Sequence, residues 1–373
     1  MTQRKFFRRF TALALVLFIF IIQLPSFGQA ADFQYNTEYL QEVEEFIKEY
    51  YLHDVTDEQL MKGAVKGLFY NLDDYSEYYT KDEFDKLIED VSGSFVGIGI
   101  YMGDDNGHVT VFSPIKDGPA YKAGLKAGDI IVSVDGKDVT SYSSADVSDL
   151  IKGKIGTKVK LGIKRNDSKD TLYFNITRDE VKVNPVSYDT VNKSLGYLNI
   201  SQFNDYTVEN VDKALNYFDQ HSIKNLIIDL RNNPGGSVDQ VVDVLKKFIP
   251  AGSIVHIKYK DGTIRTYSSS LKTPKYKLAV LINENSASAS EIFAGAVKDR
   301  KAGTLVGVTT YGKGVVQEII PLDNGDGIKL TIAEYLTPNK ISIDGKGITP
   351  DIVVKNTDPT KDLQMEKAIS LFK

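Results

Sequence analysis

The sequence predicts an α+β multidomain protein with a helical N-terminal region, a small mainly β domain and an α/β layered core. Three observations predict this class. Apolar residues recur at helical spacing up to residue 91, and short β-rich runs broken by glycine fill residues 92–179. Strand and helix patterns then alternate over residues 180–373. A length of 373 residues also exceeds what one hydrophobic core usually organises.

Residues 1–30 carry the pattern of an export signal or N-terminal membrane anchor. Four basic residues within the first nine precede an apolar stretch, Phe10–Ile22, and Pro25 follows it. We expect either cleavage after Ala30 or retention of the segment as an anchor, since it approaches the ~18 residues that can span a bilayer. In both cases the remaining chain is predicted to lie outside the cytoplasm, secreted or anchored to the outer face of the cytoplasmic membrane.

Residues 33–91 are predicted to form two or three short helices. Leu40, Val43 and Ile47 recur at helical spacing, and similar spacing follows near Leu60. The segment LDDYSEYYTKDEF (72–84) interrupts this pattern, and Thr80 followed by Glu83 predicts a capping box that opens another helix. We interpret this segment as structural.

Residues 92–179 resemble a PDZ domain. The resemblance rests on PAYKAGLKAGDIIVSVDGKDV (119–139), which predicts a short helix ending at Gly124, a turn, a strand and a tight Asp-Gly turn. It implies that the backbone amides of one loop receive a peptide C-terminus, with the last apolar side chain beside the helix before Gly124. The loop residues are Phe95, Val96, Gly97, Ile98 and Gly99. The alternatives are ordinary strand irregularity at the glycines and a domain that serves only as a spacer.

In residues 180–373, two predicted strands end in chemically distinctive loops. The apolar run 226–230 predicts a buried strand that delivers RNNPGG (231–236) to its C-terminal end. The strand KLAVLIN (277–283) leads into ENSASAS before a predicted helix near Glu291. A serine at a helix N-terminus lies where oriented amides stabilise negative charge.

A serine nucleophile needs a base, and the sequence offers lysine. The chain has no cysteine, no HExxH spacing and no GxSxG elbow, and none of its four histidines lies in a catalytic motif. His256 and His221 are expected to have strand and surface roles. Lys313 lies between two glycines, which let a loop bury an amine; burial lowers its pKa and leaves neutral amine to accept a proton.

Several motifs together are similar to the C-terminal processing (tail-specific) peptidase family. They are DLRNNPGGS, NENSASASEIFAGAVKDR, GKGVVQ, and YLTPN followed by GKGITPDI. The resemblance implies a crotonase/Clp-like peptidase core in which Ser288 is the nucleophile, Lys313 the base and Gln317 its partner. It also implies an oxyanion hole made by the N–H of Ala289 and that of a Pro-Gly-Gly glycine, Gly235 or Gly236, with the choice left open.

The implied function is an exported serine endopeptidase that cleaves proteins near their C-termini. Expected partners are proteins or peptides with free, apolar C-termini; the sequence leaves a homodimer open. We expect no cofactor and no metal. We also expect no nucleic-acid partner, since the basic residues are scattered and the net charge is −5. No cell-wall-binding domain is expected after residue 373. The alternative is a catalytically silent peptide- or ligand-binding PDZ scaffold at the membrane, against which the intact Ser288 and Lys313 argue.

Overall fold

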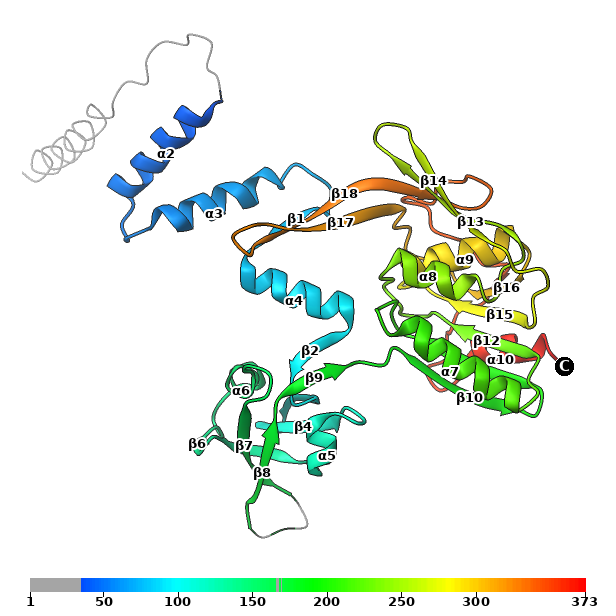
Figure 1. The fold of residues 1–373 in the computed structure, drawn as a ribbon, viewed down its shortest axis with the longest axis horizontal. Coiled ribbons are helices and arrows are strands. Elements are labelled where there is room, and N and C mark those ends of the chain that lie inside the picture. Colours follow the sequence, from blue (N-terminus) through cyan, green and yellow to red (C-terminus); the bar gives the residue numbers. More distant parts are fainter. Residues whose placement is uncertain (1–34, 166–167, 169) are drawn as a thin grey trace, which may run out of the picture. The chain divides into compact units, whose positions relative to one another are not determined.

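A computed structural model describes residues 35–165, 168 and 170–373 (Figure 1). The predicted export segment, residues 1–30, lies outside this part and stays a prediction. Over the described ranges the structure contains no helix with the length and apolar character needed to cross a membrane. The chain divides into two compact units, residues 1–65 and 66–373.

The described part of the first unit is helical. Helix α2 (Thr37–Tyr50) begins at Asn36, whose side chain accepts the N–H of Tyr39 at 2.9 Å. Helix α3 (Asp57–Leu68) follows, and Lys48 forms an ion pair with Asp57. Neither helix contains a buried residue, so this pair contributes little apolar core.

The segment predicted to interrupt the helices of residues 33–91 contains a short strand. Strand β1 (Glu77–Tyr79) pairs antiparallel with β18 (Gly327–Leu336), and Tyr78 is buried there. Helix α4 (Lys81–Ser92) then begins as predicted, with the N–H of Thr80 donating to Glu83 Oε2 at 2.8 Å. The short aromatic run of β1 pairs with β18 because this pairing buries the ring of Tyr78. No local helical preference opposes the pairing.

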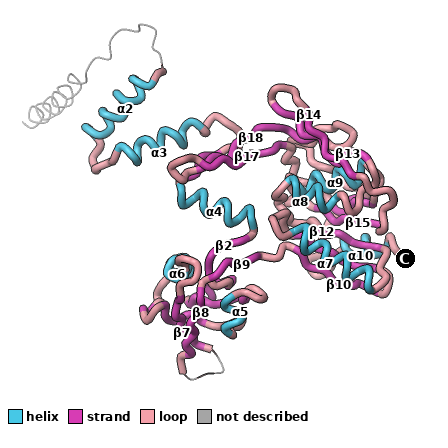
Figure 2. The backbone as a smooth tube through the Cα atoms, viewed as in Figure 1, coloured by secondary structure: helices cyan, strands magenta, loops and turns pink. Residues whose placement is uncertain are grey.

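The small β domain consists of a sheet and two helices around its own core. Its strands are β3 (Ile100–Asp105), β4 (His108–Pro114), β5 (Ile130–Val134), β6 (Lys137–Asp138), β7 (Lys158–Lys164) and β8 (Leu172–Thr177). Its helices are α5 (Pro119–Ala123) and α6 (Ser144–Ile151). A separate two-stranded ribbon, β2 (Ser94–Gly97) with β9 (Asp179–Lys182), precedes and follows the domain in sequence (Figure 2).

The core is built on a six-stranded sheet of order β10-β11-β12-β15-β16-β19, all parallel except the β10 edge. The strands are β10 (Val186–Asn192), β11 (Leu195–Ile200), β12 (Asn225–Asp229), β15 (Lys277–Ile282), β16 (Gly303–Gly307) and β19 (Ile352–Val353). The helices are α7 (Thr207–Gln220), α8 (Val238–Leu245), α9 (Ala289–Asp299) and α10 (Leu363–Ser370). This confirms the predicted mixture of helical, PDZ-like and α/β layered parts.

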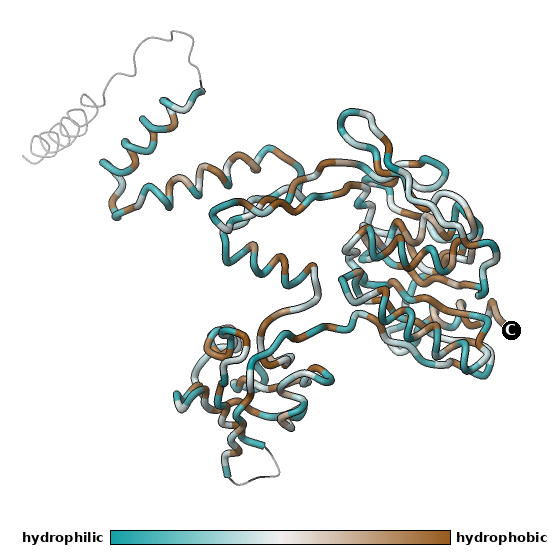
Figure 3. The backbone as a smooth tube through the Cα atoms, viewed as in Figure 1, coloured by the Kyte–Doolittle hydropathy of each residue, from teal (hydrophilic) through white to brown (hydrophobic). Residues whose placement is uncertain are grey.

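Alternate residues of the central strands fill two cores. Leu226 and Ile228 pack with residues of α7, α8 and α9, whereas Ile227 packs with Ala368 of α10 on the other face. Figure 3 shows these strands as largely hydrophobic. Burial on both faces explains why the parallel strands read as continuous apolar runs.

A second sheet completes the core, with the order β1-β18-β13-β14 and β17 paired to β18. Its further strands are β13 (Gly252–Tyr259), β14 (Ile264–Ser269) and β17 (Val315–Pro321). Strand β17 follows the Lys313 loop directly and carries Gln317. The two sheets therefore supply different catalytic candidates: β15 leads to Ser288, and the β17–β18 hairpin carries Gln317.

Candidate active site

Ser288 occupies the junction between the β15 loop and α9, in a strained backbone conformation. Its φ is 53° and its ψ is −114°, and its side chain remains half-buried. A non-glycine residue in the positive-φ region is uncommon and costs ~1–3 kcal/mol, so the surrounding structure must hold it. The neighbouring Ser286 and Ser290 are fully buried and donate to the carbonyls of Leu230 and Asn233.

The buried carboxylate of Glu291 stabilises this backbone conformation of Ser288. Its Oε2 accepts the N–H of Ser288 at 2.9 Å and the N–H of Lys313 at 2.8 Å. Its Oε1 accepts the hydroxyl of Thr310 at 2.6 Å and the N–H of Gly312 at 2.7 Å. Burial raises the pKa of Glu291, and these four hydrogen bonds oppose the rise. One side chain thus fixes both the nucleophile loop and the lysine loop.

Tyr335 of β18 makes a second link between the same two loops. Its hydroxyl lies 3.1 Å from the carbonyl oxygen of Ser288 and also hydrogen-bonds to the carbonyl oxygen of Lys313. Burial, reinforced by Glu291, raises the pKa of Tyr335 well above its ordinary value. The phenol therefore stays protonated and available as a donor.

The amine of Lys313 rests against an aromatic ring. Its Nζ lies 4.3 Å from the ring centroid of Tyr75, and it makes no hydrogen bond within residues 35–165, 168 and 170–373. Burial lowers its pKa, as does the nearby Lys329, whereas Asp73 and Glu291 oppose this shift. Burial thus makes it easier for Lys313 to lose its proton and form the neutral amine that a general base requires.

Gln317 has a different partner here from the one its predicted role requires. Its Nε2 donates to the hydroxyl of Thr331 at 3.0 Å, across the β17–β18 pair. The structure brings Gln317 onto the strand that follows the Lys313 loop but does not join the two side chains by a hydrogen bond. Its action on the lysine remains a prediction.

The Pro-Gly-Gly turn lies directly against the nucleophile. A Cβ added at Gly235 would come within 2.8 Å of both Ser288 Cβ and the Ala287 carbonyl oxygen, so only glycine fits. The N–H of Gly235 already donates to Asn233 Oδ1 at 2.8 Å. The N–H groups of Gly236 and Ala289 have no acceptor within the described part of the chain. This arrangement favours Gly236 over Gly235 as the second amide donor.

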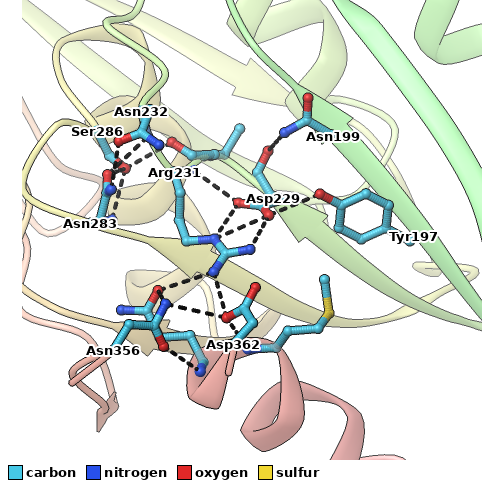
Figure 4. Close-up of polar contacts among 12 residues, drawn as sticks. Tyr197, Asn199, Asp229, Arg231, Asn232, Asn283, Ser286, Asn356 and Asp362 are labelled. Carbon is cyan, nitrogen blue, oxygen red and sulfur yellow. Dashed lines mark hydrogen bonds and ion pairs between the residues drawn. The ribbon is translucent and has the colours of Figure 1, made fainter. Parts of the chain in front are cut away.

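A polar network holds the RNNPGG loop from the α10 side of the sheet (Figure 4). Asp229 accepts the backbone N–H of Arg231 at 3.0 Å and also binds its guanidinium. Arg231 donates further to Asp362, the N-cap of α10, at 2.8 Å. Asn283 joins the ends of β12 and β15, because its Oδ1 accepts the N–H of Asn232 at 2.9 Å. Asp229 therefore has a structural role, because its carboxylate fixes the turn at Arg231.

His256, the rival base considered from the sequence, lies in β13 and is engaged elsewhere. Its Nδ1 is 2.8 Å from the hydroxyl of Thr266, and its Nε2 is 3.3 Å from the carbonyl oxygen of Pro338. Among the residues that the structure describes, no group of three or more His, Cys, Asp or Glu side chains is arranged to hold a metal ion.

The predicted peptide-binding segment, residues 95–99, lines a small groove of about 100 Å³. The opposite wall comes from α6 and the residue after it, through Ser148, Ile151 and Lys152. This corrects the prediction that the pocket lies beside the helix before Gly124. That helix, α5, is tied into the domain core: Ala120 is fully buried and its N–H donates to the carbonyl of Ile98 at 2.8 Å.

Three site residues were missed from the sequence: Glu291, Tyr335 and Tyr75. A signal existed for Glu291, because Ser288-x-x-Glu291 is a capping-box pattern before an apolar helix. No local signal marks the two tyrosines. Tyr75 belongs to the segment interpreted as structural, yet β1 pairing brings it beside Lys313.

Comparisons with known proteins all indicate the same peptidase family. The model of peptidase family S41 matches residues 194–354, and the PDZ domain model matches residues 96–179. The carboxy-terminal processing protease CtpB of Bacillus subtilis is 37% identical over 84% of this chain and 67% of its own length. The carboxy-terminal-processing protease of Bartonella bacilliformis is 37% identical over 85% of this chain and 74% of its own length. The solved structure of a photosystem II D1 C-terminal processing protease aligns with a TM-score of 0.51 and 31% identity, covering 86% of this chain and 88% of that one.

Proposed function

This chain is a carboxy-terminal processing serine protease of peptidase family S41 with a PDZ domain, and from that premise we propose that Ser288 and Lys313 form its catalytic dyad. Ser288 Oγ attacks the scissile carbonyl carbon while its proton passes to the neutral amine of Lys313. The carbon–nitrogen bond then breaks, and Lys313 returns the proton to the leaving amine. In the second step water attacks the acyl carbon while Lys313 accepts a proton from it. The ester bond to Ser288 then breaks, and Lys313 returns the proton to Ser288 Oγ.

The observation that carries this proposal is the double link between the two loops. Glu291 accepts the backbone N–H of both Ser288 and Lys313, and the single O–H of Tyr335 lies within hydrogen-bond distance of both of their carbonyl oxygens. Two buried side chains shared in this way hold the nucleophile and the base in one constellation. The N–H groups of Gly236 and Ala289 complete it as donors to the oxyanion.

The resting arrangement requires one movement before catalysis. The Lys313 amine must rotate from the face of Tyr75 toward Ser288, where Gln317 can orient it. The change is a side-chain rotation, since the backbone of Lys313 is fixed by Glu291 and Tyr335. Such rotations are fast compared with peptide hydrolysis.

The pH dependence of kcat/KM tests the assignment of the base. Because burial lowers the pKa of Lys313, kcat/KM should rise with pH along a limb centred clearly below the ~10.4 of a free lysine. The sign follows from chemistry: the protonated amine is inactive, so activity appears as pH rises through the pKa. The limb should keep its position in His256→Gln and His221→Gln. A limb that shifts or disappears in either histidine variant would exclude Lys313 as the titrating base.

We further propose that the PDZ groove captures the free C-terminus of the substrate. Residues 95–99 line the groove together with two charged residues, Lys152 and Glu89. Apolar side chains such as Ile100 and Ile151 line the remainder. Capture would raise the local concentration of the substrate at Ser288 without new contacts at the active site.

Three peptides that differ only at their ends test this capture: a free apolar terminus, its C-terminal amide, and a terminal aspartate. The free apolar peptide should be cleaved with kcat/KM at least about tenfold higher. Ser148→Trp, which fills the groove, should remove this preference, whereas Ala145→Trp, at an exposed position of the same helix outside the groove, should keep it. Equal cleavage of all three peptides by the unaltered protein would show that the groove does not read the tail.

A further inference from the structure

The ring of Tyr75 forms one wall of the position that the Lys313 amine occupies. The Nζ lies 4.3 Å from the ring centroid, well within the ~6 Å over which a cation is attracted to an aromatic face. The attraction acts on the charged ammonium because it arises from the ring quadrupole. The neutral amine lacks it.

Tyr75 is built into this place by its neighbours in sequence. Its side chain lies close to that of Tyr311, whose own backbone N–H donates to the carbonyl of Ser286 in the nucleophile loop at 3.1 Å. The next residue, Ser76, is buried, and its Oγ accepts the N–H of Thr331 at 3.0 Å. Tyr78 then pairs with Ile328 of β18. The segment that carries the ring is therefore anchored on β18, which places the ring against the Lys313 amine.

Other charges around Lys313 come from helix α9, strand β18 and two loops. Asp73 precedes β1 and Glu291 lies on α9, and both favour the ammonium; Lys329 of β18 disfavours it. Lys329 is itself directed to the Tyr79 hydroxyl at 2.6 Å, and Asp344 accepts the N–H of Gly314 at 2.9 Å. None of these groups is an acceptor for the Lys313 amine in the described chain, so the ring is its direct neighbour.

We infer that Tyr75 is a positioning residue for the catalytic base: its ring holds the ammonium form of Lys313 at rest and so sets the charge state from which the base begins. The inference rests on the proposed role of Lys313. It gives residues 72–79, interpreted from the sequence as structural, a part in the reaction. Burial and the ring act in opposite directions on the lysine, and the balance determines the pH at which neutral amine forms.

The test compares the pH limb of kcat/KM in the purified full-length protein and three variants. Tyr75→Phe keeps the ring and should leave the limb within about 0.3 pH units, because the hydroxyl is not the group that faces the amine. Tyr75→Leu removes the ring and should move the limb about 0.4 to 1.5 pH units lower. Tyr75→Trp presents a stronger aromatic face and should move it higher. The test is the pH at which kcat/KM rises, and the maximum value of kcat/KM is not used to decide it.

A matched control is Tyr173→Leu, which removes the exposed ring 4.6 Å from the amine of Lys160 in the β domain and should not move the limb. Thermal unfolding shows whether Tyr75→Leu is folded. If it is not, the limb positions of Tyr75→Phe and Tyr75→Trp are compared, and they still test the role of the ring. An unchanged limb in Tyr75→Leu, or in Tyr75→Trp where Leu is unfolded, overturns the inference while leaving Lys313 as the base. A limb that shifts in His256→Gln would instead contradict the proposed assignment of Lys313 as the base. Failure of the inference on Tyr75 and failure of the proposed function therefore give different results.

Discussion

Ser288→Ala is expected to lower kcat/KM by about 10⁴-fold or more while leaving the protein folded. The hydroxyl is the proposed nucleophile, and loss of a nucleophile leaves only binding and oxyanion stabilisation. The alanine variant keeps a Cβ at φ 53°, so its free energy of unfolding should match that of the unaltered protein. Turnover of a fluorogenic peptide and thermal unfolding measure the two quantities. Ser270→Ala, at an exposed serine, should change neither.

Ser288→Gly separates catalysis from strain at the same position. Glycine adopts positive φ without a Cβ penalty, so this variant should be inactive yet more stable by about 1 kcal/mol. The nucleophile would then be held in a conformation that costs stability, as expected of active-site residues. Substantial residual turnover in either variant would remove Ser288 from the mechanism. A glycine variant no more stable than the alanine variant would show that the backbone strain is absent.

Glu291→Ala is expected to have the second largest effect, on stability and activity together. It removes the acceptor of four donors, those of Ser288, Thr310, Gly312 and Lys313. A buried donor left without a partner costs ~1–3 kcal/mol, and water entering the space would satisfy some of them. We expect a loss of about 3–5 kcal/mol in the free energy of unfolding. Because both loops lose their common anchor, kcat/KM should fall about 10²-fold even below the unfolding transition.

Two further variants identify the cause. Glu291→Gln keeps the volume but turns an NH₂ group toward N–H donors, so it should also be destabilised and slow; a harmless glutamine would mean that the volume alone matters. Glu284→Ala, an exposed acid in the loop before Ser288, should stay within about 0.5 kcal/mol and retain activity. Chemical denaturation and peptide turnover at saturating and limiting substrate measure these effects. A Glu291→Ala protein as stable and active as Glu284→Ala would contradict the anchoring role.

The amino-acid sequence by itself determined the order of elements and the family. Glycine-punctuated β runs, the PDZ-like 119–139 segment and the continuous apolar strand before RNNPGG are patterns over neighbouring residues, which need no long-range contact to be read. The Thr80–Glu83 capping box is equally local, and the structure has it. Ser288 and Lys313 were selected through such motifs, although their roles remain proposals.

Only the tertiary structure decided what surrounds those residues. Tyr75 reaches Lys313 because β1 pairs with β18 in one register, and the groove along residues 95–99 lies against α6 and not α5 because α5 is committed to the domain core. The N–H of Gly235 donates to Asn233, whereas that of Gly236 has no acceptor among the residues that the structure describes; this difference depends on how one loop closes. These contacts join residues far apart in the chain, and their geometry follows from the packing of whole sheets and helices. A local sequence pattern carries no information on that packing.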